Sequence, residues 1–298
     1  MSTSTLAMSR SSKRRIFSTL RSFVLTLWLF ICIFPLFWMV ATSFKPDREW
    51  FAWPPVYWSN TPTLKNYMVV WANQSEYAET QYAQSMQRPW TALGNSLFIS
   101  LSATLLSVSF GAIIAYGASR YRVLSETRMF QLLMLRMVPP IVIVAPLSLY
   151  YAALNLLDSA IGLILIYFLT TLPYAVWMVK SFIDEVPREM EQAAEVLGAS
   201  RWRTMFEIVL PLIRSGLVAT FLFILILTWS EYLIAFILSK TQVVTLPIEL
   251  SKYQGTSEGR VYGRQAALAV GITLPLIIIG IFIRKHLARG FSFGMVRR

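Results

Sequence analysis

Residues 191–211 read EQAAEVLGASRWRTMFEIVLP and separate two long apolar runs of the chain. The first half of this stretch favours a helix, because Pro187 suits the first turn and Gly198 suits a left-handed C-cap. Ser200 can cap a second helix, and Pro211 marks the start of the next apolar run. The pattern predicts a short charged helix held as a knob between two membrane helices.

One face of the predicted knob helix carries small and apolar side chains. At helical spacing this face combines Met190, Ala193, Ala194 and Leu197. Small side chains let another surface approach closely, so we expect this face to dock a partner. Acidic residues crowd the beginning of the helix, where the helix dipole stabilises negative charge.

The composition predicts an all-α polytopic membrane protein. Of the 298 residues, 56% are hydrophobic and 14% are charged, and the mean hydropathy is +0.55. Such values are too apolar for a soluble domain of this size. About six apolar runs are long enough to cross ~30 Å of hydrocarbon. They cover about residues 23–42, 97–118, 129–151, 161–179, 212–238 and 266–283.

The basic residues predict the orientation. Five lie before the first run, three in the second connection, five in or just after the fourth connection and five after the last run, which places 18 of the 27 on one side. The positive-inside rule then makes residues 1–22, the loop 180–211 and the tail 287–298 cytoplasmic, flanking a transmembrane domain at 23–286. The net charge of +12 therefore reflects topology and does not indicate nucleic-acid binding.

The sequence offers no catalytic or metal-binding residues. It contains no Gly-Lys-Ser/Thr, so it has no Walker-type phosphate loop. Cys32 is the single cysteine and His286 the single histidine, which leaves no cluster with metal-ligand spacing. A membrane protein that has a docking helix but no ATPase motif of its own indicates that the energy source is an ATPase on another chain.

The knob resembles the EAA coupling motif of the ABC importer permeases, in which Glu-Ala-Ala, three residues, Gly, nine residues and Ile-x-Leu-Pro follow one another. The matching positions are Gln192, Ala193, Ala194, Gly198, Ile208, Leu210 and Pro211. Gln192 replaces the usual glutamate, and Leu197 stands where an aspartate is frequent. We expect these seven residues, with Glu191 and Ala199, to couple the chain to an ATPase.

Segments outside the knob are similar to the carbohydrate-uptake branch of that family, in particular to its six-helix permease. They include Ser43-Phe44-Lys45, Asn95-Ser96, Leu172-Pro173-Tyr174, Trp229-Ser230-Glu231-Tyr232 and Arg289-Gly290-Phe291. The resemblance implies a type I ABC importer permease of the bacterial inner membrane with both termini cytoplasmic. It implies a second permease, two ATPase subunits that carry ATP and Mg, an extracytoplasmic solute-binding protein and membrane lipid as partners.

Candidate pathway residues lie within or near the spans, at Arg136, Trp229, Glu231 and Tyr232. Arg136 lies ~12 Å into its run, where an arginine costs ~2.5–3.5 kcal/mol. It can pair with Glu231, cap carbonyls freed by Pro139 and Pro140, or line the pathway. The sequence leaves these three roles open.

The outer loop before the last run is expected to reach the solute-binding protein, through Gln254, Gly255, Thr256, Ser257 and Glu258. A solvated spacer is the alternative. The sequence does not decide whether the solute is a sugar, a polyol, a sugar phosphate or a sulfonated sugar. It also does not decide whether the solute contacts this chain directly.

Two other classes compete with an ABC permease. An ion-coupled secondary transporter needs buried acids along a path, and only Glu231 is a clear candidate. A non-transporting scaffold or sensor has no need for a helix-cap-helix knob of this spacing.

Overall fold

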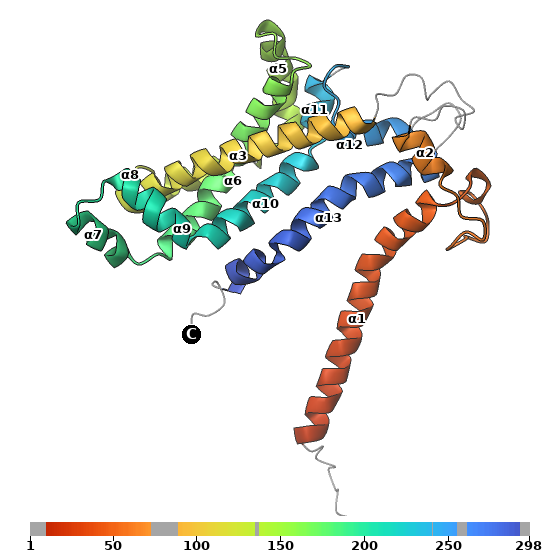
Figure 1. The fold of residues 1–298 in the computed structure, drawn as a ribbon, viewed down its shortest axis with the longest axis horizontal. Coiled ribbons are helices and arrows are strands. Elements are labelled where there is room, and N and C mark those ends of the chain that lie inside the picture. The colour runs from red at the N-terminus through yellow and green to blue at the C-terminus, as the bar shows by residue number, and fades with distance from the viewer. Residues whose placement is uncertain (1–9, 73–88, 135–136, 240, 255–260, 293–298) are drawn as a thin grey trace, which may run out of the picture. The chain divides into compact units, whose positions relative to one another are not determined.

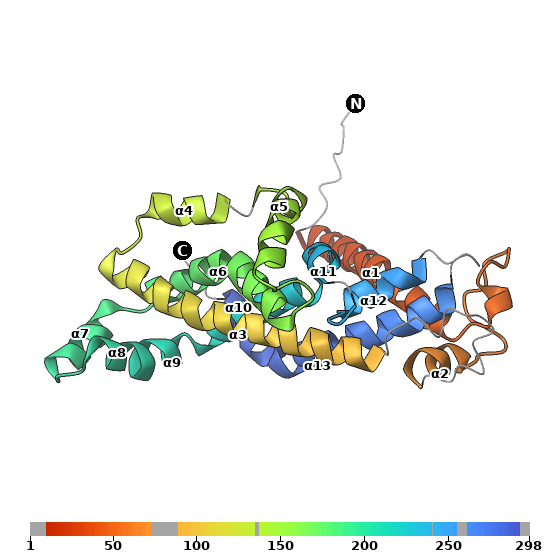
Figure 2. The ribbon, with the colours of Figure 1, turned by 90° about the horizontal axis from the view of Figure 1, so that it is seen from above.

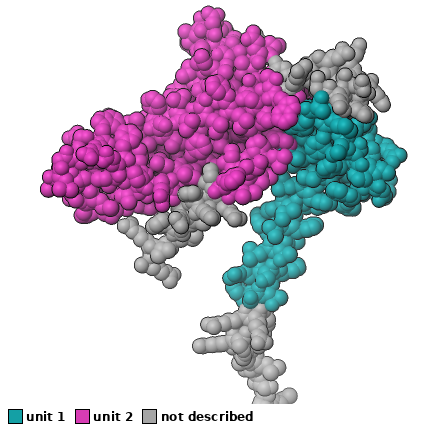
Figure 3. All heavy atoms as spheres, in the orientation of Figure 1, with its two compact units in different colours: residues 1–77, 261–270 teal, residues 78–260, 271–298 magenta. Residues whose placement is uncertain are grey.

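A computed structural model describes residues 10–72, 89–134, 137–239, 241–254 and 261–292 of the chain. Within these ranges the secondary structure is helical, with no strand (Figure 1). The chain forms two compact units (Figure 3): residues 1–77 with 261–270, and residues 78–260 with 271–298. The predicted all-α class is confirmed.

The centre of the larger unit is a bundle of three helices. Helix α3 spans Pro89–Tyr121, α6 spans Ala160–Asp184 and α10 spans Arg214–Trp229. They pack side by side in both views (Figures 1 and 2), and α3 and α6 share the most extensive contact in the molecule. This pair sets the frame on which the remaining segments of the unit are placed.

Small and hydroxylated residues allow α3 and α6 to approach closely. A Cβ atom added to Gly111 would lie 2.5 Å from Cβ of Ala175, so only glycine fits at this crossing. The hydroxyls of Ser107 and Thr171 lie 2.7 Å apart and hydrogen-bond across the same interface. Small residues and interhelical hydroxyl bonds are the typical means by which membrane helices associate.

Shorter helices complete the larger unit. They are α4 (Glu126–Met134), α5 (Pro140–Ala153), α7 (Arg188–Val196), α8 (Arg201–Thr204), the π-helix η5 (Met205–Val209), α9 (Leu210–Leu212), α11 (Leu233–Leu238), α12 (Leu246–Ser251) and the turn η6 (Lys252–Gln254). Helices α7, α8 and α9 lie together at the end of the bundle where α3 and α6 both terminate (Figure 1).

Two apolar clusters hold the larger unit together. One joins α3, α6 and η5 near α7, and we call it the α7-end cluster. Its buried members are Ala112, Ala115, Tyr116, Ala118, Met129, Val176, Val179, Ile183, Val186, Met205, Val209 and Ile213. The second cluster joins α3, α5, α6 and α11 and includes Ile99, Tyr151, Tyr167 and Leu238.

The smaller unit contains α1 (Arg10–Ser43), η1 (Asp47–Glu49), α2 (Lys65–Trp71) and the first residues of α13 (Tyr262–Ser292). The Asn66 side-chain amide donates to the carbonyls of Ser43 and Lys45 at 2.9 and 3.0 Å. The backbone that follows α1 is thereby tied to α2.

The described residues contain four helices that are long and apolar enough to cross a membrane, and five if the pair Arg201–Leu212 and Arg214–Trp229, bent by 79°, counts as one. The four are Phe17–Ser43, Pro89–Tyr121, Ala160–Asp184 and Tyr262–Phe282. Four of the six predicted runs therefore correspond to one long helix each.

The predicted spans 129–151 and 212–238 each contain two helices in the structure. In the first, α4 spans Glu126–Met134 and a separate helix, α5, begins at Pro140, where Pro139 is the N-cap and has no N–H to continue a helical ladder from the preceding residues. The 14 residues of α5 extend ~21 Å, which is shorter than the hydrocarbon layer. In the second, α10 stops at Trp229 and α11 begins at Leu233.

The candidate coupling site

Helix α7 is short, and its C-terminal end is capped by backbone hydrogen bonds. Pro187 occupies the N-cap position, one residue before the predicted first turn. At the other end Gly198 has φ +84°, and its N–H donates to the carbonyl of Glu195 at 2.9 Å. The Ala199 N–H donates to the carbonyl of Ala194 at 3.0 Å. This pair of bonds is a Schellman cap and confirms the predicted left-handed glycine.

The inner face of α7 is buried against the bundle. Glu191 is 6% exposed and Ala194 is 8% exposed. The Glu191 carboxylate accepts from Nε of Arg120 at 2.5 Å and from the hydroxyl of Tyr116 at 3.0 Å. The Glu191 carboxylate, predicted to couple to an ATPase, is therefore paired within its own chain.

The outer face of α7 presents apolar side chains to the surroundings. Val196 and Leu197 are 87% and 88% exposed, and Met190 and Ala193 are also exposed. Ala194 had been expected on the same docking face, and the structure corrects this expectation, because its methyl group points to the inner face. The exposed polar residues beside this apolar patch are Gln192 and Glu195.

The segment after Gly198 begins as predicted and then departs from a regular helix. The Ser200 side chain accepts from the Arg203 N–H at 3.3 Å, which confirms it as an N-cap. The chain then passes through the π-helix η5 before Pro211, which has no N–H to continue an α-helical ladder. A bend of 79° follows between α9 and α10.

Three apolar residues outside the motif positions pack this segment against the bundle. Met205, Val209 and Ile213 are buried and belong to the α7-end cluster, whereas Ile208 and Leu210 are half-buried and Pro211 is exposed. The buried residues recur every fourth position, a spacing that could have identified them. Arg120 and Tyr116 were likewise missed as partners of α7.

The pathway candidates near the end of α10 have different surroundings. Both oxygens of Glu231 are engaged, by the N–H groups of Ile234 and Ala235 at 2.9 and 3.1 Å and by the Tyr167 hydroxyl at 3.0 Å. Glu231 therefore caps the beginning of α11. The secondary-transporter hypothesis depended on this residue as a free buried acid.

Trp229 and Tyr232 differ in their exposure. Trp229 is 3% exposed, and among the described residues its indole N–H has no partner. Tyr232 is exposed and stacks on Phe236 with ring centroids 5.3 Å apart. Arg136 lies outside the described residues, so its three possible roles stay predictions.

The segment before the predicted binding-protein contact is tied firmly to the bundle. The carboxylate of Asp158 accepts from the backbone N–H groups of Thr241, Gln242 and Val243 at 2.9 to 3.0 Å. Gln254 ends η6, and residues 255–258 of the predicted contact lie outside the described residues.

The connection to α12 is held from the other side by α3. The Asn95 side-chain amide donates to the Val244 carbonyl at 3.0 Å, and Ser96 Oγ accepts from the Leu246 N–H at 2.8 Å. Both ends of residues 241–246 are therefore fixed to the bundle, which places α12 at the beginning of α3.

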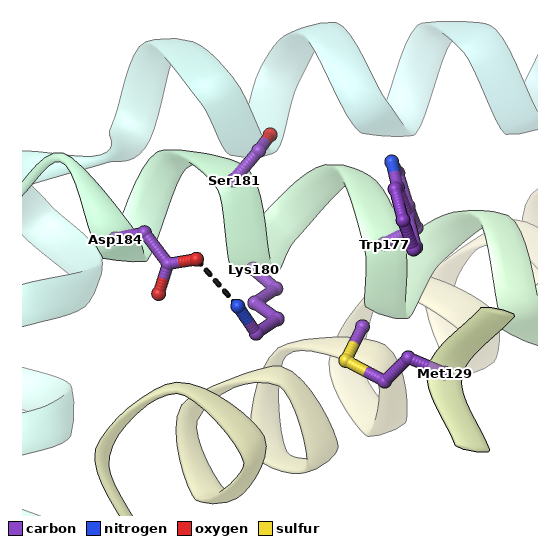
Figure 4. A pocket seen from close by; sticks show the side chains of 5 residues that line it. All are labelled: Met129, Trp177, Lys180, Ser181 and Asp184. Carbon is purple, nitrogen blue, oxygen red and sulfur yellow. Dashed lines mark hydrogen bonds and ion pairs between the residues drawn. The ribbon is translucent and has the colours of Figure 1, made fainter. Parts of the chain in front are cut away.

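A cavity of about 290 Å³ lies between α4 and α6 (Figure 4). It is lined by Met129, Trp177, Lys180, Ser181 and Asp184. Lys180 Nζ and Asp184 Oδ2 face one another at 2.5 Å, so the charges of this cavity are paired with each other. Among the residues that the structure describes, no three His, Cys, Asp or Glu side chains are grouped to hold a metal ion.

The described residues combine long apolar helices, of which α3 and α6 in the bundle are each long enough to cross a membrane, with a short helix, α7, that exposes an apolar face at the end of the bundle. The chain belongs to the family of inner membrane components of binding-protein-dependent transport systems, whose pattern matches residues 107–293. It is therefore a permease component of an ABC importer and a multi-pass protein of the bacterial inner membrane. ATPase and solute-binding subunits are partners of this family.

Three known proteins place the chain within the family. It is 31% identical to the inner membrane ABC transporter permease protein YcjP of Escherichia coli over 92% of this chain and 94% of the relative. It is 28% identical to the trehalose/maltose transport system permease protein MalG of Thermococcus litoralis over 90% and 92%. The crystal structure of a bacterial ABC transporter that imports the acidic polysaccharide alginate contains a chain with the same fold, at a TM-score of 0.74, 18% identity, and coverage of 94% and 98%.

Proposed function

We propose that this chain forms half of the translocation pathway of an ATP-driven importer for a sugar or sugar-like solute. A second permease supplies the other half, and lipid surrounds the assembly. The names of relatives support a sugar, since the Thermococcus litoralis protein is a trehalose/maltose permease. Within this proposal, the pathway candidates are Arg136, Trp229, Glu231 and Tyr232, and residues 254–258 contact the solute-binding protein.

We infer that ATP and Mg bind a separate ATPase subunit. The sequence of this chain contains no Gly-Lys-Ser/Thr, which a Walker-type phosphate loop requires. The energy of hydrolysis must then reach the bundle through a contact between chains. The positive-inside rule places α7 on the cytoplasmic side, where an ATPase subunit lies.

The exposed apolar face of α7 is the observation that carries the proposal. Val196 and Leu197 are almost fully exposed at the capped C-terminal end of α7, and Ala193 lies one turn away from each of them. Apolar side chains grouped on a surface mark an interaction site, since covering them removes apolar area from water. A cleft on the ATPase subunit is the partner that this face fits.

The replacement of the usual motif glutamate by Gln192 changes the polar part of this contact. Glu191 is occupied by Arg120. Glu195 is exposed and lies three residues after Gln192, so the two side chains share a helix face. Glu189 is also exposed and lies three residues before Gln192, so Glu189 and Glu195 are the acidic residues of α7 that can meet a cation in the ATPase cleft.

Reconstitution tests the function. The permease pair and the ATPase are placed in liposomes with the solute-binding protein, and uptake of trehalose, maltose and an anionic sugar is measured with and without ATP. We expect uptake of one of these solutes to require both ATP and the binding protein. Uptake that follows a proton or sodium gradient without ATP would contradict the proposal.

A matched pair of variants tests the docking face. Leu197→Asp introduces charge on the exposed face, and Glu207→Gln changes an exposed residue of η5. The first variant is expected to lose co-purification of the ATPase while the permease pair still accumulates in the membrane. The second variant is expected to retain the ATPase. Equal retention in both would reject α7 as the docking element.

A further inference from the structure

Arg120 joins three segments through one side chain. It lies in the last turn of α3, and its Nε donates to Oε1 of Glu191 in α7 at 2.5 Å. One terminal nitrogen donates to the carbonyls of Ile183 and Val186, each at 2.9 Å. The Ile183 carbonyl belongs to the last turn of α6 and also accepts from the backbone N–H of Val186 at 3.0 Å. The guanidinium therefore links the ends of α3, α6 and α7.

Neighbouring polar groups strengthen the same junction. The Tyr116 hydroxyl, one turn before Arg120 in α3, donates to the second oxygen of Glu191 at 3.0 Å. The Ser119 side chain donates to Asp184 at the end of α6, and the Ser119 carbonyl accepts from the Arg188 guanidinium at 3.3 Å. The first turn of α7 is thus attached to α3 by three hydrogen bonds, two to the Glu191 carboxylate and one from the Arg188 guanidinium.

The junction is largely excluded from solvent. The side chains of Arg120 and Glu191 are each 8% exposed, and Tyr116, Ile183 and Val186 around them belong to the α7-end cluster. Removing one partner of a buried ion pair leaves an uncompensated charge, which is far more disruptive than the loss of an exposed pair. A lysine at position 120 cannot reproduce the fixed fork that reaches a carboxylate and two carbonyls at once.

The same region contains a natural comparison. Arg203 and Glu207 also form a short pair, at 2.8 Å, but their side chains are 65% and 60% exposed. They lie one helical turn apart in a continuous segment, so this pair does not connect two separate helices. Exposed pairs of this kind contribute little. Both pairs join an arginine Nε to a glutamate carboxylate, but the Arg120–Glu191 pair is buried between helices and the Arg203–Glu207 pair is exposed within one segment.

We propose that Arg120 and Glu191 form a clamp that makes α7 move as one body with the ends of α3 and α6. Glu191 is then a positioning residue for coupling and not a contact of the ATPase. This proposal rests on the proposed function of α7 as the docking element. A clamp is needed because an ATPase that pulls on a loosely attached helix would move that helix without moving the bundle.

The clamp is tested by the accessibility of the surface beneath α7. Ala194→Cys places a thiol on the buried inner face, in a chain whose only other cysteine, Cys32, is replaced by serine. The rate of modification by a maleimide is measured in the assembled importer for Glu191→Gln, Arg120→Lys and, as the matched control, Glu207→Gln. ATPase co-purification and uptake per ATP hydrolysed are measured on the same variants without the cysteine.

We expect Glu191→Gln to raise the modification rate by about 100-fold, as the loss of one partner of a buried pair opens α7. Arg120→Lys is expected to give a smaller rise and Glu207→Gln none. The ATPase should still co-purify with every variant, because the exposed face of α7 is unchanged, while uptake per ATP falls in the two clamp variants.

Three results would overturn the proposal. They are an unchanged modification rate in Glu191→Gln, loss of the ATPase from Glu191→Gln, and failure of both clamp variants to fold while Glu207→Gln is normal. Failure of both clamp variants to fold would mean that the Arg120–Glu191 pair is needed for folding and has no separate role in coupling. An unmodified chain that never associates with an ATPase would instead contradict the proposed function, so the two failures are distinguishable.

Discussion

Replacing Gly198 by alanine tests the link between backbone conformation and α7. Gly198 has φ +84°, and an added Cβ would meet nothing within 4 Å. The substitution therefore introduces no clash, and its effect is the cost of a left-handed conformation for a residue with a Cβ atom, about 1–2 kcal/mol. The C-terminal cap of α7 should weaken by this amount.

Gly94 provides a control for the same chemical change. It lies in α3, is exposed, and an added Cβ would likewise meet nothing within 4 Å. Here alanine should stabilise by about 0.5–1 kcal/mol, because glycine within a helix loses more backbone entropy on folding. The two substitutions differ only in the backbone that receives them, and their effects should have opposite signs.

Hydrogen exchange reads the cap directly. The amides of Gly198 and Ala199 donate the two bonds of the Schellman cap, and a loss of 1–2 kcal/mol should speed their exchange roughly 5- to 30-fold in Gly198→Ala. Gly94→Ala should leave these amides unchanged and raise the midpoint of thermal unfolding. Unchanged exchange in Gly198→Ala, or the same sign for both variants, would refute the reasoning.

Three further substitutions probe packing, burial and charge. Gly111→Ala should destabilise the fold by about 1–3 kcal/mol through overpacking, because the added Cβ would lie 2.5 Å from Cβ of Ala175. The midpoint of thermal unfolding should therefore fall, and an unchanged midpoint would show that α3 and α6 separate easily. Burial raises the pKa of Glu249 above its usual 4.5, and Lys252 offsets only part of the effect. A raised pKa means that the fold disfavours the carboxylate, so Glu249→Gln should raise the thermal midpoint at pH 7.5, with a gain that shrinks toward pH 4.5; a gain independent of pH would contradict this. Gln192→Glu changes an exposed side chain and should leave ATPase co-purification within error of the unmodified chain.

Local chemistry made part of the coupling site predictable. A glycine in a left-handed cap and a serine at an N-cap act through bonds that reach only a few residues along the chain, and Gly198 and Ser200 occupy the predicted positions. The apolar runs likewise predicted the long helices, since length and composition decide whether a helix can cross hydrocarbon.

Contacts between distant segments were not predictable in this way. Arg120 and Glu191 are 71 residues apart. In the sequence Arg120 counted only as a basic loop residue, and Glu191 was expected to contact the ATPase. The face on which Ala194 lies depends on where α7 is seated, and this is fixed by the bundle and not by the helical period. The break between α4 and α5 was visible as Pro139 and Pro140, yet hydropathy alone continued through it.

Cross-linking from α7 tests most directly whether its exposed face docks the ATPase. A photoreactive cross-linker is attached to Leu197→Cys, which is exposed, or to Ala194→Cys, which is buried, after Cys32 is replaced by serine. We expect a covalent adduct with the ATPase subunit from position 197 and little or none from position 194. No adduct from position 197, or equal adducts from both, would contradict the assignment of this face.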